Sequence, residues 1–304
     1  MSHHPYRTFR TTVARVTALS PHFTRITLRG DDLVHFGTDG LDQRIKLIIP
    51  LADGSVTDVG QFDESQSMTE WYRRWRQLPV EKRNPIRTYT IRSPRPADRE
   101  IDIDFVLHGT DGPASAWATA ARVGDPLCVV GPDSRSEEGG GGIEWRPGAA
   151  TSVLIAGDET ATPAICSIVE SLPADAVGEV CIEVPTEADQ LSIVAPAGVN
   201  VRWLARGSGA HGVRLSAAVH EWGLRRAAQP DPVGSAVAAP DAEPASDEIL
   251  WEVPDAVDGR EYAWLAGEAG TITALRRHLV RDLGIDRRSV AFMGYWREGR
   301  AEAS

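Results

Sequence analysis

The chain has 304 residues, of which 42% are hydrophobic and 25% are charged, and its formal net charge is −11. A globular protein of this length has room for two domains, each with its own core. The acidic balance argues against nucleic acid as a general partner, and no run of about eighteen apolar residues predicts a membrane span. The first ten residues are polar and contain no apolar signal segment, so we expect a cytoplasmic protein.

Residues 1–135 are predicted to form an antiparallel β-barrel, because short alternating stretches are separated by turn signals. Ser93-Pro94 is interpreted as one of these turns. Trp71 and Trp75 recur at helical spacing and are expected to belong to the core. The expected strands are 10–19, 24–29, 45–49, 87–91, 101–106 and 126–131, and the expected helices are 69–78 and 113–121.

Residues 136–149 are rich in glycine and predict a flexible linker. In residues 150–304, strands then alternate with helices, which predicts an α/β domain with a parallel sheet. Residues 226–248, rich in Ala, Pro and Asp, predict a looped insertion within that domain. The expected strands are 152–156, 179–184, 201–204, 261–266 and 289–294, and the expected helices are 161–172, 213–221 and 270–283.

The three cysteines, Cys128, Cys166 and Cys181, are far apart in apolar stretches. No two of them have the spacing of a metal-ligand pair, so we predict no zinc site, no iron–sulfur cluster and no disulfide framework. They are expected to pack as small buried hydrophobic residues. No metal site is predicted anywhere in the chain.

The strand at 87–91 carries the strongest functional signal. Its alternation places Arg87 and Tyr89 on one face, where a guanidinium and a flat aromatic ring lie side by side. A flavin dinucleotide uses both, a cation for its pyrophosphate and a π-surface for its isoalloxazine ring. Further along the chain, His108-Gly109 and Gly112 precede a helix whose N-terminal amides suit the same pyrophosphate. Together these segments predict a bound flavin.

A nucleotide site is predicted at the carboxyl edge of the second sheet, where sheets of this kind bind ligands. Gly157, Asp158 and Thr160 come directly between a predicted strand and a predicted helix. Gly267 and Glu268 repeat that design at a later strand. Neither turn matches the GxGxxG pattern, and the alternative for each is an ordinary strand–helix turn.

Residues 70–100 contain nine Lys/Arg and four Asp/Glu, which is a local basic stretch in an acidic protein. Such a surface attracts an anionic ligand, although a solvated basic face is the simpler alternative.

In this order the motifs resemble the siderophore-interacting proteins, the ferric-siderophore reductases among the ferredoxin-reductase-like flavoproteins. The resemblance implies an FAD-binding barrel, an NAD(P)H-binding domain, and reduction of siderophore-bound Fe(III) with release of Fe(II). It covers nearly the whole chain, but residues 136–149 and 226–248 are not part of it. The segments that carry it are 87–92, 104–109, 112–117, 156–160, 264–268 and 294–299.

The resemblance also implies roles in the first domain. Arg87 would hold the FAD pyrophosphate, Tyr89 would pack on the flavin, and Thr90 would hydrogen-bond near the nitrogen at which hydride arrives. Lys46 and Arg92 are the candidates for binding an anionic ferric siderophore, and we expect Lys46 to face outward by alternation. The catalytic candidates are Thr90, Tyr89 and Glu268. The other FAD-binding candidates are Thr88, Arg92, His108, Gly112, Pro113, Ala114 and Ser115.

In the second domain, Gly157, Asp158, Thr160 and Gly267 are expected to contact the nicotinamide nucleotide. Glu268 would line the same pocket or cap its helix. Arg206 would pair with a 2′-phosphate and favour NADPH, whereas nearby acidic residues would oppose that phosphate, so the choice between NADH and NADPH stays open. These acidic residues are Glu183, Glu187 and Asp189. The residues expected to cover the flavin are Tyr295 and Trp296.

Two other functions remain open at this point. One is a general flavin reductase or diaphorase of the same fold, or a flavoprotein that exchanges electrons with ferredoxin. The other is a siderophore-binding module without catalytic activity.

Overall fold

The computed structural model describes residues 3–37, 39–110, 112–138, 141–228, 251–254 and 259–299. The chain forms two compact units that divide between Ile143 and Glu144, within the segment predicted to be a linker. The predicted insertion at 226–248 lies outside the described residues from position 229 onward. Among the described helices, none is long and apolar enough to span a membrane.

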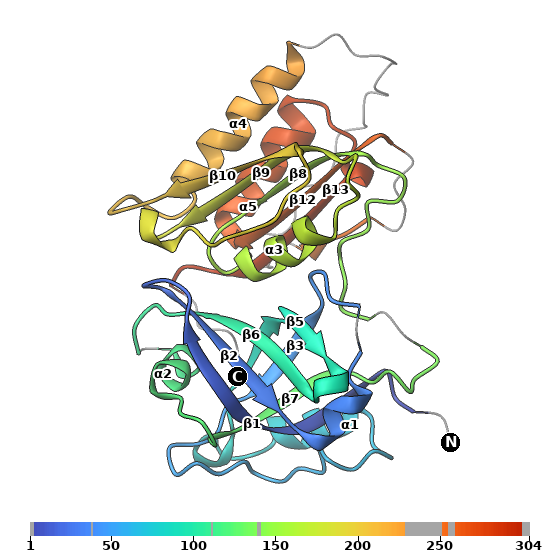
Figure 1. Ribbon diagram of the computed structural model, residues 1–304, viewed down its shortest axis with the longest axis vertical. Coiled ribbons are helices and arrows are strands. Elements are labelled where there is room, and N and C mark those ends of the chain that lie inside the picture. The colour runs from blue at the N-terminus through green and yellow to red at the C-terminus, as the bar shows by residue number, and fades with distance from the viewer. Residues whose placement is uncertain are drawn as a thin grey trace. The chain divides into compact units, whose positions relative to one another are not determined.

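In its described part, the first unit contains a seven-stranded sheet with the order β4-β3-β7-β1-β2-β6-β5 (Figure 1). All of its pairings are antiparallel, which confirms the predicted barrel-type architecture. The strands are β1 (Tyr6–Ala18), β2 (Phe23–Arg29), β3 (Arg44–Ile48), β4 (Ile86–Thr90), β5 (Ser93–Arg95), β6 (Glu100–Val106) and β7 (Pro126–Pro132).

The turn predicted at Ser93-Pro94 is wrong, because these residues belong to the short strand β5. A central strand forms hydrogen bonds with neighbours on both sides, and proline has no amide hydrogen to donate to them. Here β5 is an edge strand with β6 as its neighbour in the sheet, so the missing donor is tolerated.

Alternation along the strands builds the core of the first unit. In β6, Ile101, Ile103 and Phe105 are fully buried in the main hydrophobic cluster. The intervening acidic residues face the other side of the sheet, where arginines cover them. Burial of the apolar side chains is the main favourable contribution to folding of such a sheet.

Two α-helices accompany this sheet, α1 (Met68–Arg76) and α2 (Pro113–Ala120). A capping box between Ser67 and Glu70 begins α1. Its Trp71 and Trp75 are 3% exposed and pack in a second apolar cluster, which confirms their predicted place in the core. The 3-10 helices of this unit are η1 (Asp31–His35), η2 (Val80–Lys82) and η3 (Pro96–Asp98).

The described part of the second unit contains a six-stranded sheet with the order β10-β9-β8-β12-β13-β11. Its pairings are parallel, as predicted, except that β11 runs antiparallel to β13 at the edge. Strand β11 has only two residues and was not predicted. The strands are β8 (Ser152–Gly157), β9 (Val177–Val184), β10 (Gly198–Ala205), β11 (Trp251–Glu252), β12 (Glu261–Glu268) and β13 (Val290–Trp296).

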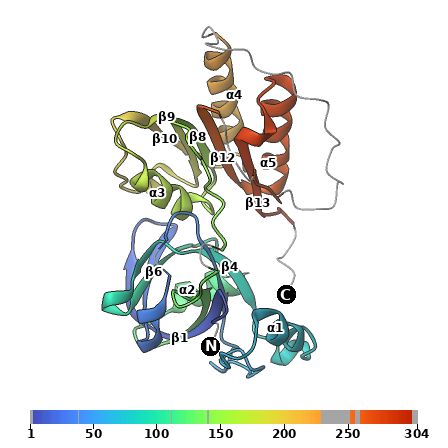
Figure 2. The same ribbon diagram turned by 90° about the vertical axis from the view of Figure 1, so that its right-hand side faces the viewer.

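Helix α3 lies on one face of this sheet, and α4 and α5 lie on the other (Figure 2). The helix predicted at 270–283 changes character within its length, because α5 continues into a π-helical segment, Arg277–Asp282. The helices are α3 (Thr162–Ser171), α4 (Val213–Ala227) and α5 (Ala269–Arg276), and the 3-10 helices are η4 (Glu187–Asp189) and η6 (Arg287–Ser289).

The three cysteines are free and buried, as predicted. Burial raises the pKa of the Cys128 thiol to about 11 and that of the Cys181 thiol to about 12. Both groups are therefore neutral thiols at physiological pH and behave as apolar packing groups.

Candidate functional site

Strand β4 presents two of the predicted flavin-binding side chains, Arg87 and Tyr89, on the face that it shares with the barrel core. Arg87 lies opposite Leu47 and Tyr89 lies opposite Ile45 in the register with β3. The Tyr89 ring is half-buried and packs against Phe105, with ring centroids 4.6 Å apart. This contact fixes the ring at the edge of the core, so Tyr89 is placed as a rigid aromatic surface.

The other face of β4 carries Thr88, which is exposed, and Thr90, which is 6% exposed. Lys46 of β3 lies opposite Thr88, and its ammonium group donates to the Thr88 hydroxyl at 3.2 Å. Lys46 thus lies on the outer face of the sheet, as alternation predicted. Its role in binding the substrate stays a prediction.

The glycine turn before α2 is held by the side chain of Ser115. Its hydroxyl donates to the Gly109 carbonyl at 2.6 Å and accepts from the His108 amide at 3.1 Å. Gly109 has φ +91°, a left-handed conformation that favours glycine. A Cβ at Gly112 would lie 3.1 Å from the His108 ring, so the ring packs closely over this glycine.

Helix α2 begins at Pro113, and its N-cap residue Gly112 provides no side-chain cap. Within the described residues, the N-cap therefore gives no side-chain acceptor to the first-turn amides of Ala114 and Ser115, the type of group with which helix N-termini bind phosphate. Trp117 of α2 packs against Phe105 at 5.8 Å, and Phe105 in turn packs against Tyr89.

A row of three aromatic rings thus connects the uncapped helix to the arginine-bearing strand. These groups fit the pyrophosphate and ring system of FAD.

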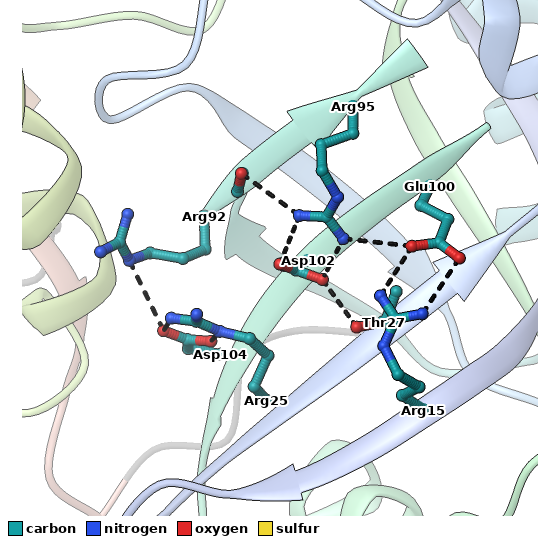
Figure 3. Close-up of polar contacts among 9 residues, drawn as sticks. Arg15, Arg25, Thr27, Arg92, Arg95, Glu100, Asp102 and Asp104 are labelled. Carbon is teal, nitrogen blue, oxygen red and sulfur yellow. Dashed lines mark hydrogen bonds and ion pairs between the residues drawn. The ribbon is translucent and has the colours of Figure 1, made fainter. Parts of the chain in front are cut away.

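Beside this site, the outer side of β6 carries buried acidic residues beneath arginines (Figure 3). Asp104 is 2% exposed and accepts two hydrogen bonds from Arg25, at 2.7 and 2.8 Å. The Nε atom of Arg92 lies 3.7 Å from the same carboxylate. Asp104 therefore offsets part of the Arg92 charge that was predicted to act on FAD or substrate.

The same row continues with Asp102 and Glu100. Arg95 donates to both oxygens of Asp102, at 2.6 and 2.8 Å. Arg15 donates to both oxygens of Glu100, at 3.2 and 2.6 Å, and Arg29 donates to one of them at 2.5 Å. Hydrogen bonds from Arg15 and the other arginines lower the pKa of Glu100 to about 2. The alternation of acidic and apolar residues in the sequence 100–104 could have predicted this row of carboxylates.

At the carboxyl edge of the second sheet, Asp158 joins the ends of three strands. Its Oδ1 accepts from the amide and hydroxyl of Thr160, at 2.9 and 2.5 Å. Its Oδ2 accepts from the Glu268 amide and from the Trp296 indole, both at 2.8 Å. Burial, followed by the neighbouring Glu159 charge, raises the pKa of Asp158 to about 6.

Two predicted glycines make room for this carboxylate and for close strand packing. A Cβ at Gly267, where φ is +152°, would lie 2.6 Å from Asp158 Oδ2. A Cβ at Gly157 would lie 2.6 Å from the Ala266 carbonyl oxygen. The structure therefore brings Gly157, Asp158, Thr160 and Gly267 together as predicted, and their contact with a nucleotide stays a prediction.

Glu268 caps α5, because its carboxylate accepts from the Thr271 amide at 2.7 Å. Burial opposes ionisation of this group, but the amides of Gly270 and Thr271 keep the pKa of Glu268 below its usual value. The structure shows the helix cap considered for Glu268, and its place in the nicotinamide pocket and its catalytic role stay predictions.

Arg206 is held between two glutamates. It donates to both oxygens of Glu159, at 2.9 and 2.8 Å, and to Glu183 at 3.2 Å. The Glu183 carboxylate also accepts from the amides of Gly212 and Leu215 at the start of α4, at 2.8 and 2.9 Å. Arg206 and Glu183 were both predicted to lie near the nucleotide, but their pairing and the part of Glu159 were not predicted.

The remaining candidates have packing partners in the second unit. Tyr295 stacks on Trp251 with ring centroids 5.9 Å apart, and the Trp296 indole meets His211 edge-on at 4.9 Å. Asp189 is buried in a capping box with Thr186. The flavin contact expected of Tyr295 and Trp296 stays a prediction.

Comparison with known proteins agrees with this architecture. Residues 12–136 match the siderophore-interacting FAD-binding domain, and residues 150–299 match the siderophore-interacting protein domain. The fold alone is shared with a ferredoxin NADP+ reductase from Neisseria gonorrhoeae, at a TM-score of 0.57 and 12% identity over 95% of this chain and 99% of that chain. The chain is thus a two-domain protein of the ferredoxin-reductase-like class with an FAD-binding first domain.

The chain belongs to the siderophore-interacting protein family. An uncharacterized protein of Mycobacterium tuberculosis is 33% identical over 99% of this chain and 94% of its own length. The ferric vibriobactin reductase ViuB of Vibrio cholerae is 29% identical over 93% of this chain and 87% of its own length. The crystal structure of the siderophore-interacting protein SipS from Aeromonas hydrophila aligns with a TM-score of 0.67 and 29% identity, covering 98% and 94% of the two chains.

Proposed function

We propose that this protein is an FAD-dependent NAD(P)H:ferric-siderophore oxidoreductase that releases iron as Fe(II) in the cytoplasm. The observation that carries the proposal is the uncapped N-terminus of α2, connected through Phe105 and Trp117 to the Tyr89 ring of β4. The similarity to a ferric vibriobactin reductase supports the reaction. The free, buried cysteines fit a reducing compartment.

When bound, FAD supplies the chemistry that side chains lack, because it accepts hydride and passes electrons on singly. The chain's own residues bind and orient it. Arg87 and the amides of Ala114 and Ser115 would hold the pyrophosphate, and Tyr89 would pack against the ring system. The Thr90 hydroxyl would provide a hydrogen-bonding group beside the reacting face.

Reduction suffices to release the metal because siderophores hold hard Fe(III) through oxygen ligands, which bind the softer and less charged Fe(II) far less well. The protein then needs to bring an anionic ferric complex near the flavin without ligating the iron. Lys46 and Arg92 are the cations proposed for this attraction. Arg92 contributes less than a free guanidinium, because Asp104 lies beside it.

The test is an anaerobic assay that traps Fe(II) with a coloured chelator. The purified, FAD-loaded protein is given several ferric siderophores with NADH, NADPH or reduced ferredoxin as the electron donor. We expect Fe(II) to form with a nicotinamide nucleotide. Flavin reduction without Fe(II) would instead indicate a general flavin reductase, and Fe(II) with ferredoxin alone would indicate a ferredoxin-linked enzyme. A protein that binds siderophore but no FAD would be a non-catalytic module.

A further inference from the structure

We propose that the carboxyl edge of the second sheet selects NADH over NADPH, with Glu159 and Glu183 as the specificity-determining residues. This inference rests on the proposed use of a nicotinamide nucleotide. An arginine at such an edge accommodates the 2′-phosphate of NADPH, whereas an acidic residue accepts a hydrogen bond from the free 2′-hydroxyl of NADH. Here Arg206 follows β10, but its guanidinium is already bound by carboxylates of the protein.

The ion pair of Arg206 leaves little capacity for a phosphate. Glu159 occupies both of its terminal nitrogens, and Glu183 shares one of them. The side chains of Arg206, Glu159 and Glu183 are only 9%, 8% and 0% exposed. A 2′-phosphate would have to displace a buried, bidentate carboxylate and leave that charge unpaired, which is strongly unfavourable.

The N-terminus of α4 is closed to phosphate as well. Both oxygens of the fully buried Glu183 accept backbone amides there, from Gly212 and Leu215. Helix N-termini attract anions through such amides and the helix dipole. Because a carboxylate of the chain already fills this position, the helix offers no second anchor for the phosphate.

The charge balance of this edge also opposes a phosphate. Among the described residues, Glu159 and Glu183 supply two carboxylates to this ion-pair network and Arg206 supplies one guanidinium, so the network is negative overall. The Nδ1 atom of His211 lies 3.7 Å from the Glu159 carboxylate. In a partly buried site, repulsion between like charges is screened less than in water.

The same arrangement suits an unphosphorylated ribose. Ribose hydroxyls are hydrogen-bond donors, and a carboxylate is the acceptor that nucleotide-binding sheets use for them. Glu159 follows β8, which lies where the strand order reverses, with β9 and β10 on one side and β12 and β13 on the other. Ligands bind in the crevice at such reversal points.

The test measures binding separately from electron transfer. Calorimetric titration of the FAD-loaded protein compares ADP-ribose with 2′-phospho-ADP-ribose, which differ only in the phosphate at issue. We expect ADP-ribose to bind at least about tenfold more tightly. Equal affinity, tighter binding of the phosphorylated ligand, or no binding of either would overturn the inference.

Variants assign the effect to residues. Glu159→Gln frees the Arg206 fork, so we expect the preference for ADP-ribose to fall by several-fold, through tighter binding of the phosphorylated ligand. Asp175→Asn removes the same charge from an exposed position just before β9, at the opposite edge of the sheet, and should leave the ratio unchanged. An equal effect of both variants would contradict a local role for Glu159.

If Glu159→Gln fails to fold, as judged by circular dichroism, the wild-type ratio still decides the question. Failure of the proposed function has a different signature. A protein that prefers ADP-ribose but yields no Fe(II) from any ferric siderophore would refute the reductase activity and leave the nucleotide preference standing.

Discussion

Both units of this protein bury carboxylates beneath arginines, but they do so in different places. In the first unit, Glu100, Asp102 and Asp104 lie on the face of β6 opposite the side chains that pack in the main hydrophobic cluster. In the second unit, Glu159 and Glu183 lie at the sheet edge where a nucleotide is expected. The same ion-pair chemistry thus lies on a strand face in one unit and at the proposed nucleotide site in the other.

Three individual helices, α2, α4 and α5, also differ in how their N-termini are capped. The N-cap of α2 has no side-chain cap, whereas α4 receives Glu183 and α5 receives Glu268. Where the protein caps its own helix with a carboxylate, an anionic ligand has no place. The N-terminus of α2 is therefore the one proposed here to bind an anion, whereas at α4 and α5 acidic side chains of the protein already fill that position.

The largest expected effect concerns the packing around Asp158. Gly267→Ala should lower the free energy of unfolding by about 3 kcal/mol, because the new methyl group would contact Asp158 Oδ2 and φ is +152°. The matched control is Gly284→Ala, which also has positive φ but has no atom within 4 Å of the added Cβ, and should cost about 1 kcal/mol. Denaturant unfolding measures both, and equal losses would show that Asp158 does not fix this edge.

The ion-pair row of the first unit should have a smaller effect. Glu100→Gln should cost about 2 kcal/mol, less than a fully buried pair, because Arg15 and Arg29 are 53% and 62% exposed. Asp31→Asn breaks an exposed pair with Arg99 and should cost no more than about 0.5 kcal/mol. Chemical denaturation measures the unfolding free energy of both variants. Equal losses would show that the buried carboxylate row is no more stabilising than an ordinary surface ion pair.

For the proposed anion site, Arg87→Ala should weaken FAD binding about tenfold, the loss expected for a charged hydrogen bond worth about 1.4 kcal/mol. Arg73→Ala removes an exposed arginine of α1 in the same unit and should leave FAD affinity unchanged. Fluorescence titration of the apoprotein with FAD measures both. Full retention of FAD by the Arg87 variant would contradict its pyrophosphate role.

A further effect is a pH dependence of stability that differs in sign between the units. The pKa of Glu100 falls from its ordinary value of 4.5 to about 2, so its contribution is complete above pH 4.5 and is lost as the pH falls toward 2. The pKa of Asp158 rises from 3.8 to about 6, so stability from this group declines as the pH rises through that window. Glu100→Gln should weaken the pH dependence of the unfolding free energy between pH 2 and 4.5, and Asp158→Asn should weaken it between pH 3.8 and 6. If both variants had the same pH profile as each other, the opposite signs would be refuted.

Much of the fold could be predicted from sequence because alternation and strand–helix order are local patterns. The edge strands β5 and β11 were missed because three and two residues carry too little periodicity. The turn motifs at Gly157 and Gly267 could be found because glycine is needed where backbone approaches so closely. The ion pair between Arg206 and Glu159 was harder to predict, because the two residues are 47 positions apart in the sequence and are brought together only by the folding of the sheet.

The most direct test of the proposed reductase is an anaerobic visible spectrum of the FAD-loaded protein. NADH is added first, and a ferric siderophore is added after the flavin absorption has been lost. We expect NADH to bleach the flavin, and the ferric siderophore to restore its colour with two Fe(II) formed for each flavin reoxidised, because FAD carries two electrons and Fe(III) accepts one. A flavin that NADH bleaches but that the ferric siderophore cannot reoxidise would contradict the account.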